Sequence, residues 1–424
     1  MDKLVIAGGK PLEGSVPISG AKNSALAILA GSLLSTGECL ISNVPNLLDV
    51  QVICEVLASL GVRLMATPDG MVRVDASTLR EHTTPYHLVT RMRASFFVLG
   101  PILARLGQAR IPLPGGCAIG SRPVDLHLKG LRSLGAKVNI GHGFVEAFAD
   151  KLVGGNVYLD YPSVGATETI MMAATLAEGR TVIENCAQEP EIADLADFLI
   201  KMGASIQGAG SETITIEGTS SLNRCDHKVI PDRIEAGTFM VAAAITKGKL
   251  RLQNVRLDHL QAVISKLVEC GMEIVPEGPD LLVSAPTTLK PIDLRTLPFP
   301  GFPTDLQAPL MTLLATVNGT SVVAETVFEN RFLHVDELIR MGANIKTEGN
   351  CAIIQGVPVL TGAPVQATDL RAGAAMVLAG LAARGETVVS DIHHIDRGYE
   401  RLEEKLTNVG ANIKRIPTTD SVLV

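Results

Sequence analysis

The sequence predicts an α/β protein built from six copies of one unit of about 70 residues. Two series of regularly spaced glycines indicate the repeat, and the composition indicates the kind of interior. Hydrophobic residues make up 46% of the 424 residues, while the aromatic residues are ten Phe, four Tyr and no Trp. Such an aliphatic composition is typical of packed layers of helices and sheets.

The first glycine series follows the pattern Leu-x-x-apolar-Gly and marks the end of an amphipathic helix in each unit. Glycine is favoured just after a helix because the chain turns there through a left-handed conformation. A short strand is predicted after each glycine, as at 343–345. The glycines of this series recur once in each unit, at Gly61, Gly135, Gly203, Gly271, Gly342 and Gly410.

The second series closes a more apolar helix in each unit, and a β-rich segment such as 181–185 follows it. Because this helix is apolar on nearly every side, we expect it to be buried. Each unit is thus predicted to contain helix, strand, helix, strand and a hairpin, and six units divide into two domains of three. The glycines of the second series recur with the same period, at Gly37, Gly107, Gly179, Gly248, Gly319 and Gly385.

Five of the six apolar helices are predicted to begin at a charged residue. In each case this residue lies about four helical turns before the second-series glycine of its unit. A cation in the first turn opposes the helix dipole, so either an acidic cap compensates it or it binds an anion. Asp232 and Asp369 precede two of these cations, and capping is the favoured explanation for Arg233. The charged residues are, in chain order, Lys22, Arg93, Arg233, Asp305 and Arg371.

Lys22 differs from the other cations because no acidic residue lies beside it. Its neighbours at 19–24 are small enough for a phosphate to reach the backbone N–H groups at the start of the helix. An anion-binding role is therefore favoured for Lys22 over a structural one.

The segment 112–123 packs three prolines and three glycines around one thiol, so neither a helix nor a strand runs through it undisturbed. One interpretation is a lid that presents a reactive Cys117, with Arg122 lowering the pKa of the thiol and holding an anion. The alternative is an ordinary hairpin with a bystander cysteine.

Three further places carry charged groups with more than one interpretation. Asp305 at a helix start either remains ionised for chemistry or serves as a helix cap. The segment 326–332 is either a binding rim or a solvated turn. His393 and His394 follow a predicted strand, where they would point to opposite sides and form a poor metal pair; an anion-binding or structural role for Arg397 is favoured there.

Charge, hydropathy and cysteines exclude several classes of protein. Lys and Arg number 37 against 44 Asp and Glu, so the net charge of −7 disfavours nucleic-acid binding. No apolar run reaches the roughly 20 residues of a membrane span, and the first residues do not resemble a secretory signal. The seven cysteines show no C-x-x-C spacing, and nucleotide-binding glycine motifs are missing. We expect a cytoplasmic protein without cofactor or metal and with neither a nucleic-acid nor a membrane partner.

Eight motifs in the six-unit frame span essentially the whole chain, at 20–23, 92–95, 114–127, 163–167, 302–305, 325–332, 367–371 and 394–399. Together they resemble the signatures of the UDP-N-acetylglucosamine 1-carboxyvinyltransferase family. The resemblance implies the inside-out α/β barrel of enolpyruvyl transferases, with two domains of three units each. The N-terminal domain would span 22–229 and carry the Cys117 loop. The C-terminal domain would combine 1–21 with 230–424, and the active site would lie in the cleft between the domains.

The resemblance also implies the reaction and its substrates. The family transfers the enolpyruvyl group of phosphoenolpyruvate to the 3′-hydroxyl of UDP-N-acetylglucosamine and releases phosphate, the first committed step of peptidoglycan synthesis. Cys117 would donate the proton to C3, form a covalent adduct with phosphoenolpyruvate and react with the epoxide fosfomycin. Asp305 would orient and deprotonate the 3′-hydroxyl, while Asp369 is either a catalytic carboxylate or a helix cap.

The remaining site residues follow from the same resemblance. Lys22, Arg122 and Arg397 would hold the phosphate and carboxylate of phosphoenolpyruvate, with Arg93 and Arg371 adding positive charge. In some members a basic residue stands just before Ser163, where this chain has Asp-Tyr-Pro at 160–162. The nucleotide sugar would contact Asn23, Arg122, Pro123, Val124, Asp125, Leu126, Ser163, Val164, Gly165, Asp305 and Val327.

Two other functions compete with the transferase. The related 5-enolpyruvylshikimate-3-phosphate synthases share the architecture but lack the Pro-Gly-Gly-Cys segment. A non-catalytic regulator that binds nucleotide sugars is the third hypothesis, although no proposed chemical residue is missing. The sequence leaves the oligomeric state open, and also which of two paralogous forms this is.

Overall fold

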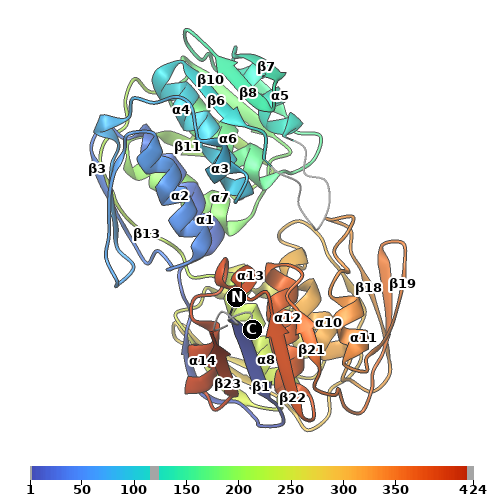
Figure 1. Cartoon of the computed structure of the whole chain (residues 1–424). Coiled ribbons are helices and arrows are strands. Elements are labelled where there is room, and N and C mark those ends of the chain that lie inside the picture. The colour runs from blue at the N-terminus through green and yellow to red at the C-terminus, as the bar shows by residue number, and fades with distance from the viewer. Residues whose placement is uncertain (1, 115–123, 418–424) are drawn as a thin grey trace. The chain divides into compact units, whose positions relative to one another are not determined.

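The computed structural model describes residues 2–114 and 124–417 of the chain (Figure 1). Contacts within these residues divide them into two compact units, with boundaries between Ser19 and Gly20 and between Ile230 and Pro231. The N-terminal unit comprises 20–114 and 124–230, and the C-terminal unit comprises 2–19 and 231–417. Each unit has its own hydrophobic core.

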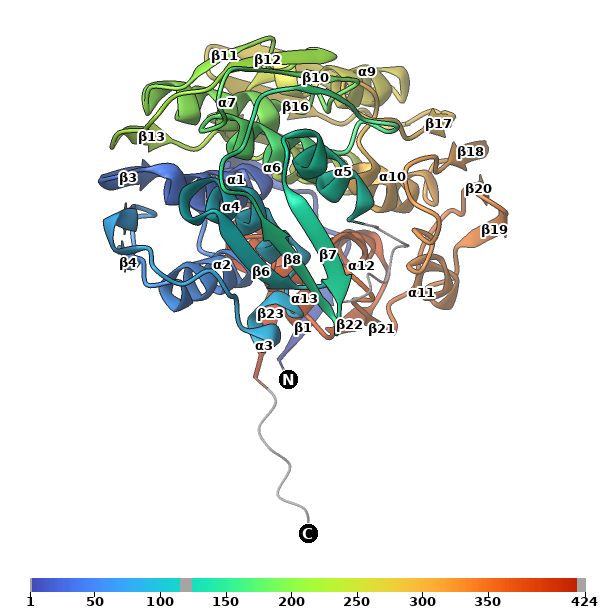
Figure 2. The ribbon, with the colours of Figure 1, turned by 90° about the horizontal axis from the view of Figure 1, so that it is seen from above.

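The described strands of the N-terminal unit are β3 (Glu38–Ser42), β4 (Arg63–Ala66), β5 (Val72–Asp75), β6 (Gln108–Pro112), β7 (Lys137–Gly141), β8 (Phe144–Phe148), β9 (Asn156–Tyr158), β10 (Arg180–Glu184), β11 (Ser205–Gln207), β12 (Thr213–Glu217) and β13 (Asp226–Lys228). They form three small sheets, in the orders β13-β3-β5-β4, β6-β8-β7 and β11-β12-β10-β9. Figure 2 shows β6, β8 and β7 side by side. In the two four-stranded sheets, one parallel pair (β3 with β13, β9 with β10) joins an antiparallel hairpin.

The strands of the C-terminal unit are β1 (Lys3–Ala7), β2 (Glu13–Pro17), β14 (Lys249–Gln253), β15 (Glu273–Glu277), β16 (Asp280–Ser284), β17 (Leu294–Arg295), β18 (Thr320–Ala324), β19 (Asn344–Glu348), β20 (Cys351–Gln355), β21 (Pro364–Gln366), β22 (Glu386–Ser390) and β23 (Asn412–Ile416). Their orders are β15-β16-β14-β2, β17-β18-β20-β19 and β21-β22-β1-β23. Each sheet again has one parallel pair: β2 with β14, β17 with β18, and β21 with β22.

The described α-helices of the N-terminal unit are α1 (Lys22–Gly31), α2 (Leu48–Ser59), α3 (Tyr86–Val89), α4 (Leu99–Leu106), α5 (Asp125–Ser133), α6 (Val164–Ala174) and α7 (Pro190–Lys201). The C-terminal unit has α8 (Arg233–Ile245), α9 (Gln261–Glu269), α10 (Gln307–Leu314), α11 (Val335–Arg340), α12 (Leu370–Ala382), α13 (His393–Asp396) and α14 (Leu402–Asn408). Short 3-10 helices are η1 (Ser32–Leu34), η2 (Ala76–Thr78), η3 (Arg93–Val98), η4 (Leu257–His259) and η5 (Thr304–Leu306).

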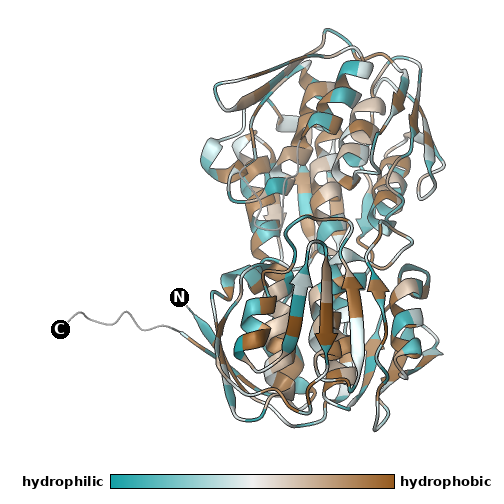
Figure 3. Ribbon diagram, turned by 90° about the vertical axis from the view of Figure 1, so that its right-hand side faces the viewer, coloured by the Kyte–Doolittle hydropathy of each residue, from teal (hydrophilic) through white to brown (hydrophobic). Residues whose placement is uncertain are grey.

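The apolar helices are buried, as the sequence predicts. In α8 every residue from Ile234 to Ile245 is buried, and in α12 every residue from Arg371 to Leu381. The helices α8, α10 and α12 contact one another, and hydrophobic residues follow the inner helices of each unit in Figure 3. A helix without a polar face is stable in water only when it is covered on all sides. The sheets and the amphipathic helices of each unit provide this cover.

The six glycines of the first series confirm the predicted helix ends. All six adopt a left-handed backbone, with φ between 87° at Gly135 and 109° at Gly271. Each follows an amphipathic helix and precedes a strand, as Gly342 does between α11 and β19. A side chain with a Cβ atom would be strained in this conformation.

Two of the predicted helix starts are wrong in detail. Arg93 and Asp305 lie on the 3-10 helices η3 and η5, and the α-helices begin afterwards, at Leu99 and Gln307. Pro101 and Pro309 stand at the third position of these helices. Because the ring of a proline collides with the carbonyl four residues earlier, an α-helix does not continue upstream through that position.

His393 and His394 follow a strand, as predicted, but the expectation that they point to opposite sides is wrong, because they do not continue the extended backbone. Strand β22 ends at Ser390, Asp391 takes a left-handed backbone with φ of 57°, and both histidines lie in the one-turn helix α13. Their ring centroids are 4.1 Å apart.

No helix in the described part of the chain is long and apolar enough to span a membrane.

Candidate active site

The charged centre of the C-terminal unit is Asp305, held between two buried arginines. Its Oδ1 accepts a hydrogen bond of 2.7 Å from Arg331, and its Oδ2 accepts bonds of 3.1 and 2.9 Å from Nε and Nη2 of Arg371. The arginine side chains are 5% and 4% exposed, whereas the Asp305 side chain is 26% exposed. The carboxylate is therefore the member of this cluster that solvent or a ligand can reach.

Burial by itself would raise the pKa of Asp305, but the guanidiniums of Arg371 and Arg331 outweigh it and hold the pKa well below its usual range. The carboxylate is consequently ionised at neutral pH. No backbone N–H of η5 bonds to this side chain as a cap, so the alternative interpretation of Asp305 as a helix cap is wrong.

The helix α12 positions Arg371 at its second residue. Asp369 is the N-cap of this helix and its Oδ1 accepts hydrogen bonds from the N–H groups of Arg371 and Ala372, at 2.7 and 3.0 Å. The guanidinium of Arg371 lies 5.2 Å from the ring centre of Tyr399, and the Tyr399 hydroxyl shares a hydrogen bond of 2.9 Å with Thr238. Burial lowers the pKa of Arg371, but Tyr399 and Asp305 raise it overall, so this cation is permanent.

Sequence reasoning missed Arg331 as a member of this cluster. It belongs to the segment 326–332, for which a binding rim and a solvated turn were both open. Arg331 is 5% exposed and bonds to Asp305 and Thr304, so this end of the segment is not a solvated turn. Val327, in the same segment, donates its N–H to Glu325 at 2.8 Å.

Arg397 follows α13 directly and is half-buried. Burial lowers the pKa of the neighbouring His394, and the charges of His393 and Arg397 lower it further. Among the described residues, no group of three or more His, Cys, Asp or Glu side chains is arranged to hold a metal ion.

The N-terminal unit carries Lys22 at the first position of α1. Its Nζ lies 2.7 Å from Oδ2 of Asp49, and the two side chains are 12% and 4% exposed. Asp49 stands in the first turn of α2, and the strand β3 separates this helix from α1 along the chain. The absence of an adjacent acid in the sequence therefore did not mean that Lys22 lacks an acidic neighbour in space.

Next to Lys22, a hydrogen bond to Asp194 of α7 holds the start of α1 in place. Asn23 is half-buried, and Ser24 donates its hydroxyl to Asp194 of α7. Asp194 also contacts Nε2 of His227 at 2.9 Å and accepts the N–H of Ile230 at 3.3 Å. These bonds fix the first turn of α1 against α7 and β13.

Most of the described residues predicted to bind the nucleotide sugar in the N-terminal unit lie at the starts of α5 and α6, which contact each other, while Asn23 lies on α1. Ser163 caps α6 by accepting the N–H of Ala166 at 3.3 Å. Gly165 approaches so closely that a Cβ atom there would lie 3.0 Å from the His127 ring and 3.1 Å from the Phe97 ring. Val164 lies beside them in α6, while Val124, Asp125 and Leu126 form the start of α5.

His127 connects this group to Arg93. Its Nδ1 lies 3.0 Å from the Thr169 hydroxyl, and its ring packs edge-on against Phe96. Burial lowers the pKa of His127 to about 3, and the nearby charge of Arg93 contributes to the shift. The ring is therefore neutral at physiological pH.

Three predicted site residues, Cys117, Arg122 and Pro123, lie outside the described residues. The neighbouring departure from the family pattern, at 160–162, is described: Asp160 pairs with Lys129 of α5, whose Nζ lies 2.7 Å from Oδ2. A positive charge thus stands beside the place where some family members carry a basic residue.

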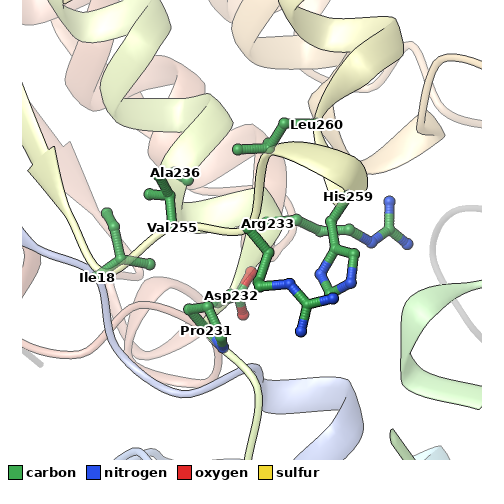
Figure 4. A pocket seen from close by; sticks show the side chains of 9 residues that line it. Ile18, Pro231, Asp232, Arg233, Ala236, Val255, His259 and Leu260 are labelled. Carbon is green, nitrogen blue, oxygen red and sulfur yellow. The ribbon is translucent and has the colours of Figure 1, made fainter. Parts of the chain in front are cut away.

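The capping explanation for the helix that begins at Arg233 is confirmed. Asp232 accepts the N–H groups of Ile234 and Glu235 at 2.7 and 3.0 Å, as the N-cap of α8. The side chain of Arg233 lines a small hollow together with His259 and Ile18 (Figure 4). The hollow lies wholly within the C-terminal unit.

Comparison with known proteins gives a consistent result. A family model described as EPSP synthase (3-phosphoshikimate 1-carboxyvinyltransferase) matches residues 6–406. A UDP-N-acetylglucosamine 1-carboxyvinyltransferase 1 from Caldanaerobacter subterraneus is 58% identical over 97% of this chain and 99% of its own length. A UDP-N-acetylglucosamine 1-carboxyvinyltransferase from Gloeobacter violaceus is 59% identical, covering 97% of this chain and 90% of its own.

Solved structures show the same fold. The enolpyruvyl transferase NikO from Streptomyces tendae has a TM-score of 0.89 and 28% identity, covering 98% of this chain and 99% of its own. EPSP synthase from Acinetobacter baumannii has a TM-score of 0.74 at 19% identity, covering 98% of this chain and 100% of its own.

Proposed function

The chain belongs to the UDP-N-acetylglucosamine 1-carboxyvinyltransferase family, and from this membership we propose its reaction and the roles of its residues. It transfers the enolpyruvyl group of phosphoenolpyruvate to the 3′-hydroxyl of UDP-N-acetylglucosamine and releases phosphate, a step of peptidoglycan synthesis. The observation that carries this function is 58% identity to a transferase of that name along nearly the full length of both chains.

In this reaction the 3′-oxygen bonds to C2 of phosphoenolpyruvate, the hydroxyl proton leaves and C3 gains a proton. Loss of phosphate from C2 and of one proton from C3 then yields the enol ether. Asp305 is the residue we assign to the 3′-hydroxyl. Of about four acceptor positions on a carboxylate, three are taken by the arginines, and the vacant one is on Oδ1.

The two arginines also define how Asp305 works. A carboxylate with a strongly lowered pKa is a weak base. We therefore assign Asp305 mainly to orienting the 3′-hydroxyl. The hydroxyl proton would pass to Asp305 only late, as the C2–O bond forms.

The anionic substrate needs several cations. Lys22, Arg122 and Arg397 are assigned to the phosphate and carboxylate of phosphoenolpyruvate, and Arg93 and Arg371 strengthen the positive field. Cys117 is assigned the proton transfer to C3 and a covalent adduct with phosphoenolpyruvate, and Asp369 is included among the catalytic carboxylates. The nucleotide sugar is assigned to Asn23, the segment 122–126, the segment 163–165, and Val327.

The finer architecture is part of the same proposal. We propose an inside-out α/β barrel in each of two domains, 22–229 and 1–21 with 230–424, each made of three repeats. The recurring combination of one parallel pair with an antiparallel hairpin, around a buried helix, supports the repeat. We also propose that the enzyme acts in the cytoplasm, where nucleotide sugars and phosphoenolpyruvate are made.

The test is phosphate release from phosphoenolpyruvate, measured in parallel with UDP-N-acetylglucosamine and with shikimate 3-phosphate. Release only with the nucleotide sugar is the expected result. Release only with shikimate 3-phosphate would instead identify an EPSP synthase, the activity named by the family model. Binding of the nucleotide sugar without any release would identify a regulator.

A further inference from the structure

Glu325 is a buried carboxyl group that has no role in the function described so far. It follows β18 directly and is 2% exposed. Its Oε1 accepts hydrogen bonds from the Thr296 hydroxyl at 2.8 Å and from the N–H groups of Val327 and Phe328 at 2.8 and 3.1 Å. Several donors thus converge on one acceptor. The Glu325 side chain holds the turn at 326–328 together with Thr296, whose hydroxyl accepts the N–H of Thr326 at 3.0 Å.

The other oxygen of Glu325 reaches the Asp305 cluster. Its Oε2 accepts the hydroxyl proton of Thr304 at 2.8 Å. The proton of Thr304 is thereby directed away from Arg331, which leaves a lone pair on Thr304 Oγ1 to accept the bond of 2.9 Å from Nη1 of Arg331. Through Nη2 the same guanidinium binds Oδ1 of Asp305.

We propose that Glu325 is a positioning residue for the transferase reaction, an inference that rests on the proposed function. One carboxylate aligns the turn of Val327, assigned to the nucleotide sugar, with the guanidinium that orients Asp305. Val327 bonds to Glu325 directly, and Arg331 is linked to Glu325 through the Thr304 hydroxyl. Glu325 would thereby fix the position of the nucleotide sugar, and so of its 3′-hydroxyl, relative to Asp305.

Two variants separate this role from simple packing. Glu325→Gln keeps the shape but puts an amide NH2 against one set of donors. Thr304→Val is nearly isosteric and removes both bonds of this hydroxyl, to Glu325 Oε2 and from Arg331, but it leaves the bonds of Glu325 Oε1 to the turn at 326–328 in place. Thr304→Ser keeps the hydroxyl and serves as the rescue. The control is Thr312→Val on α10, which removes a more deeply buried hydroxyl whose hydrogen bond goes to the carbonyl of Ala308.

The measurements are kcat, KM for UDP-N-acetylglucosamine and the pH profile of kcat from about pH 4 to pH 8, with the thermal midpoint of every variant. We expect Thr304→Val and Glu325→Gln to lower kcat between about tenfold and a hundredfold. Since Arg331 holds the Asp305 pKa down, its displacement raises that pKa, and the acid-side decline of kcat moves to higher pH. Only Glu325→Gln also raises KM, because the neutral amide oxygen left to the donors of the turn at 326–328 is a weaker acceptor than the carboxylate.

Thr304→Ser and Thr312→Val should keep the kcat and the pH profile of the wild type. A folded Thr304→Val variant with wild-type kcat and pH profile overturns the inference while the transferase function stands. A loss of kcat in Thr312→Val equal to that in Thr304→Val overturns it as well, because the effect would then be general packing. Wild-type protein that releases no phosphate overturns the proposed function, and this inference with it.

Discussion

At the scale of single residues, burial affects two ionisable groups of this molecule in different ways. Asp305 stays ionised because two guanidiniums bind it. His127 instead stays neutral, because burial lowers its pKa to about 3 and the charge of Arg93 adds to the shift. The first arrangement keeps a charge available for a substrate, while the second makes folding sensitive to pH.

His127 therefore predicts a loss of stability in acid. Its folded-state pKa is lowered below the unfolded value of 6.5, so the unfolded chain takes up a proton as the pH falls through 6.5 and the folded chain does not until about 3. Below the unfolded pKa, His127 lowers the free energy of unfolding by up to about 1.4 kcal/mol for each pH unit. Between pH 6.5 and 5, the free energy of unfolding should fall by about 2 kcal/mol on this account.

Urea titrations of wild type and His127→Gln across this range provide the measurement. The stability advantage of the wild type over the variant should shrink as the pH falls. The control is His87→Gln, which replaces an exposed histidine and should leave the pH dependence unchanged. Parallel curves for wild type and His127→Gln would show that the ring does not titrate in this way.

At the scale of helices, the chain uses acidic residues at helix starts in two different ways. Asp232 and Asp369 cap α8 and α12 through backbone N–H groups, each two and three residues ahead. Asp49 instead pairs with the side chain of Lys22, and so joins the first turns of α1 and α2. Caps follow from neighbouring positions in the sequence, whereas the ion pair between two helices does not.

Asp369 allows the cap to be separated from a role in chemistry. Asn caps a helix about as well as Asp, so Asp369→Asn should keep the stability of the wild type. Asp369→Ala should lower it by about 1 kcal/mol. Because we include the Asp369 charge in catalysis, both variants should lower kcat about a hundredfold, the range of acid–base groups. Full activity in Asp369→Asn would reduce Asp369 to a helix cap.

Lys22 and Asp49 allow a second separation. Lys22→Met removes the cation that pairs with the 4% exposed Asp49 carboxylate, and we expect it to cost about 3 kcal/mol of stability. Adding Asp49→Asn removes the negative charge as well and should restore most of the stability. It should not restore the affinity for phosphoenolpyruvate, because the assigned ligand cation is still missing. Recovery of both properties in the double variant, measured by urea unfolding and KM, would make the role of Lys22 purely structural.

At the scale of the whole molecule, each unit has its own core and its own set of assigned ligand residues. A ligand that binds the folded chain stabilises it in proportion to the logarithm of its concentration. At a hundred times its Kd, UDP-N-acetylglucosamine should add about 2.7 kcal/mol to the free energy of unfolding. Thermal unfolding with increasing nucleotide sugar checks this, with shikimate 3-phosphate as the ligand that should cause no shift. Equal shifts with both ligands would contradict the assigned specificity.

The sequence by itself determined the left-handed glycines that follow the amphipathic helices, the burial of the apolar helices such as α8 and α12, the cap at Asp232, and the family. These features depend on residues within a few positions of one another, or on motifs that need no coordinates. Only the tertiary structure showed that Asp49 meets Lys22, that Arg331 and Arg371 hold Asp305 over separations of 26 and 66 residues, and that Glu325 binds Thr304. Such contacts arise from the packing of distant segments, which local periodicity does not encode.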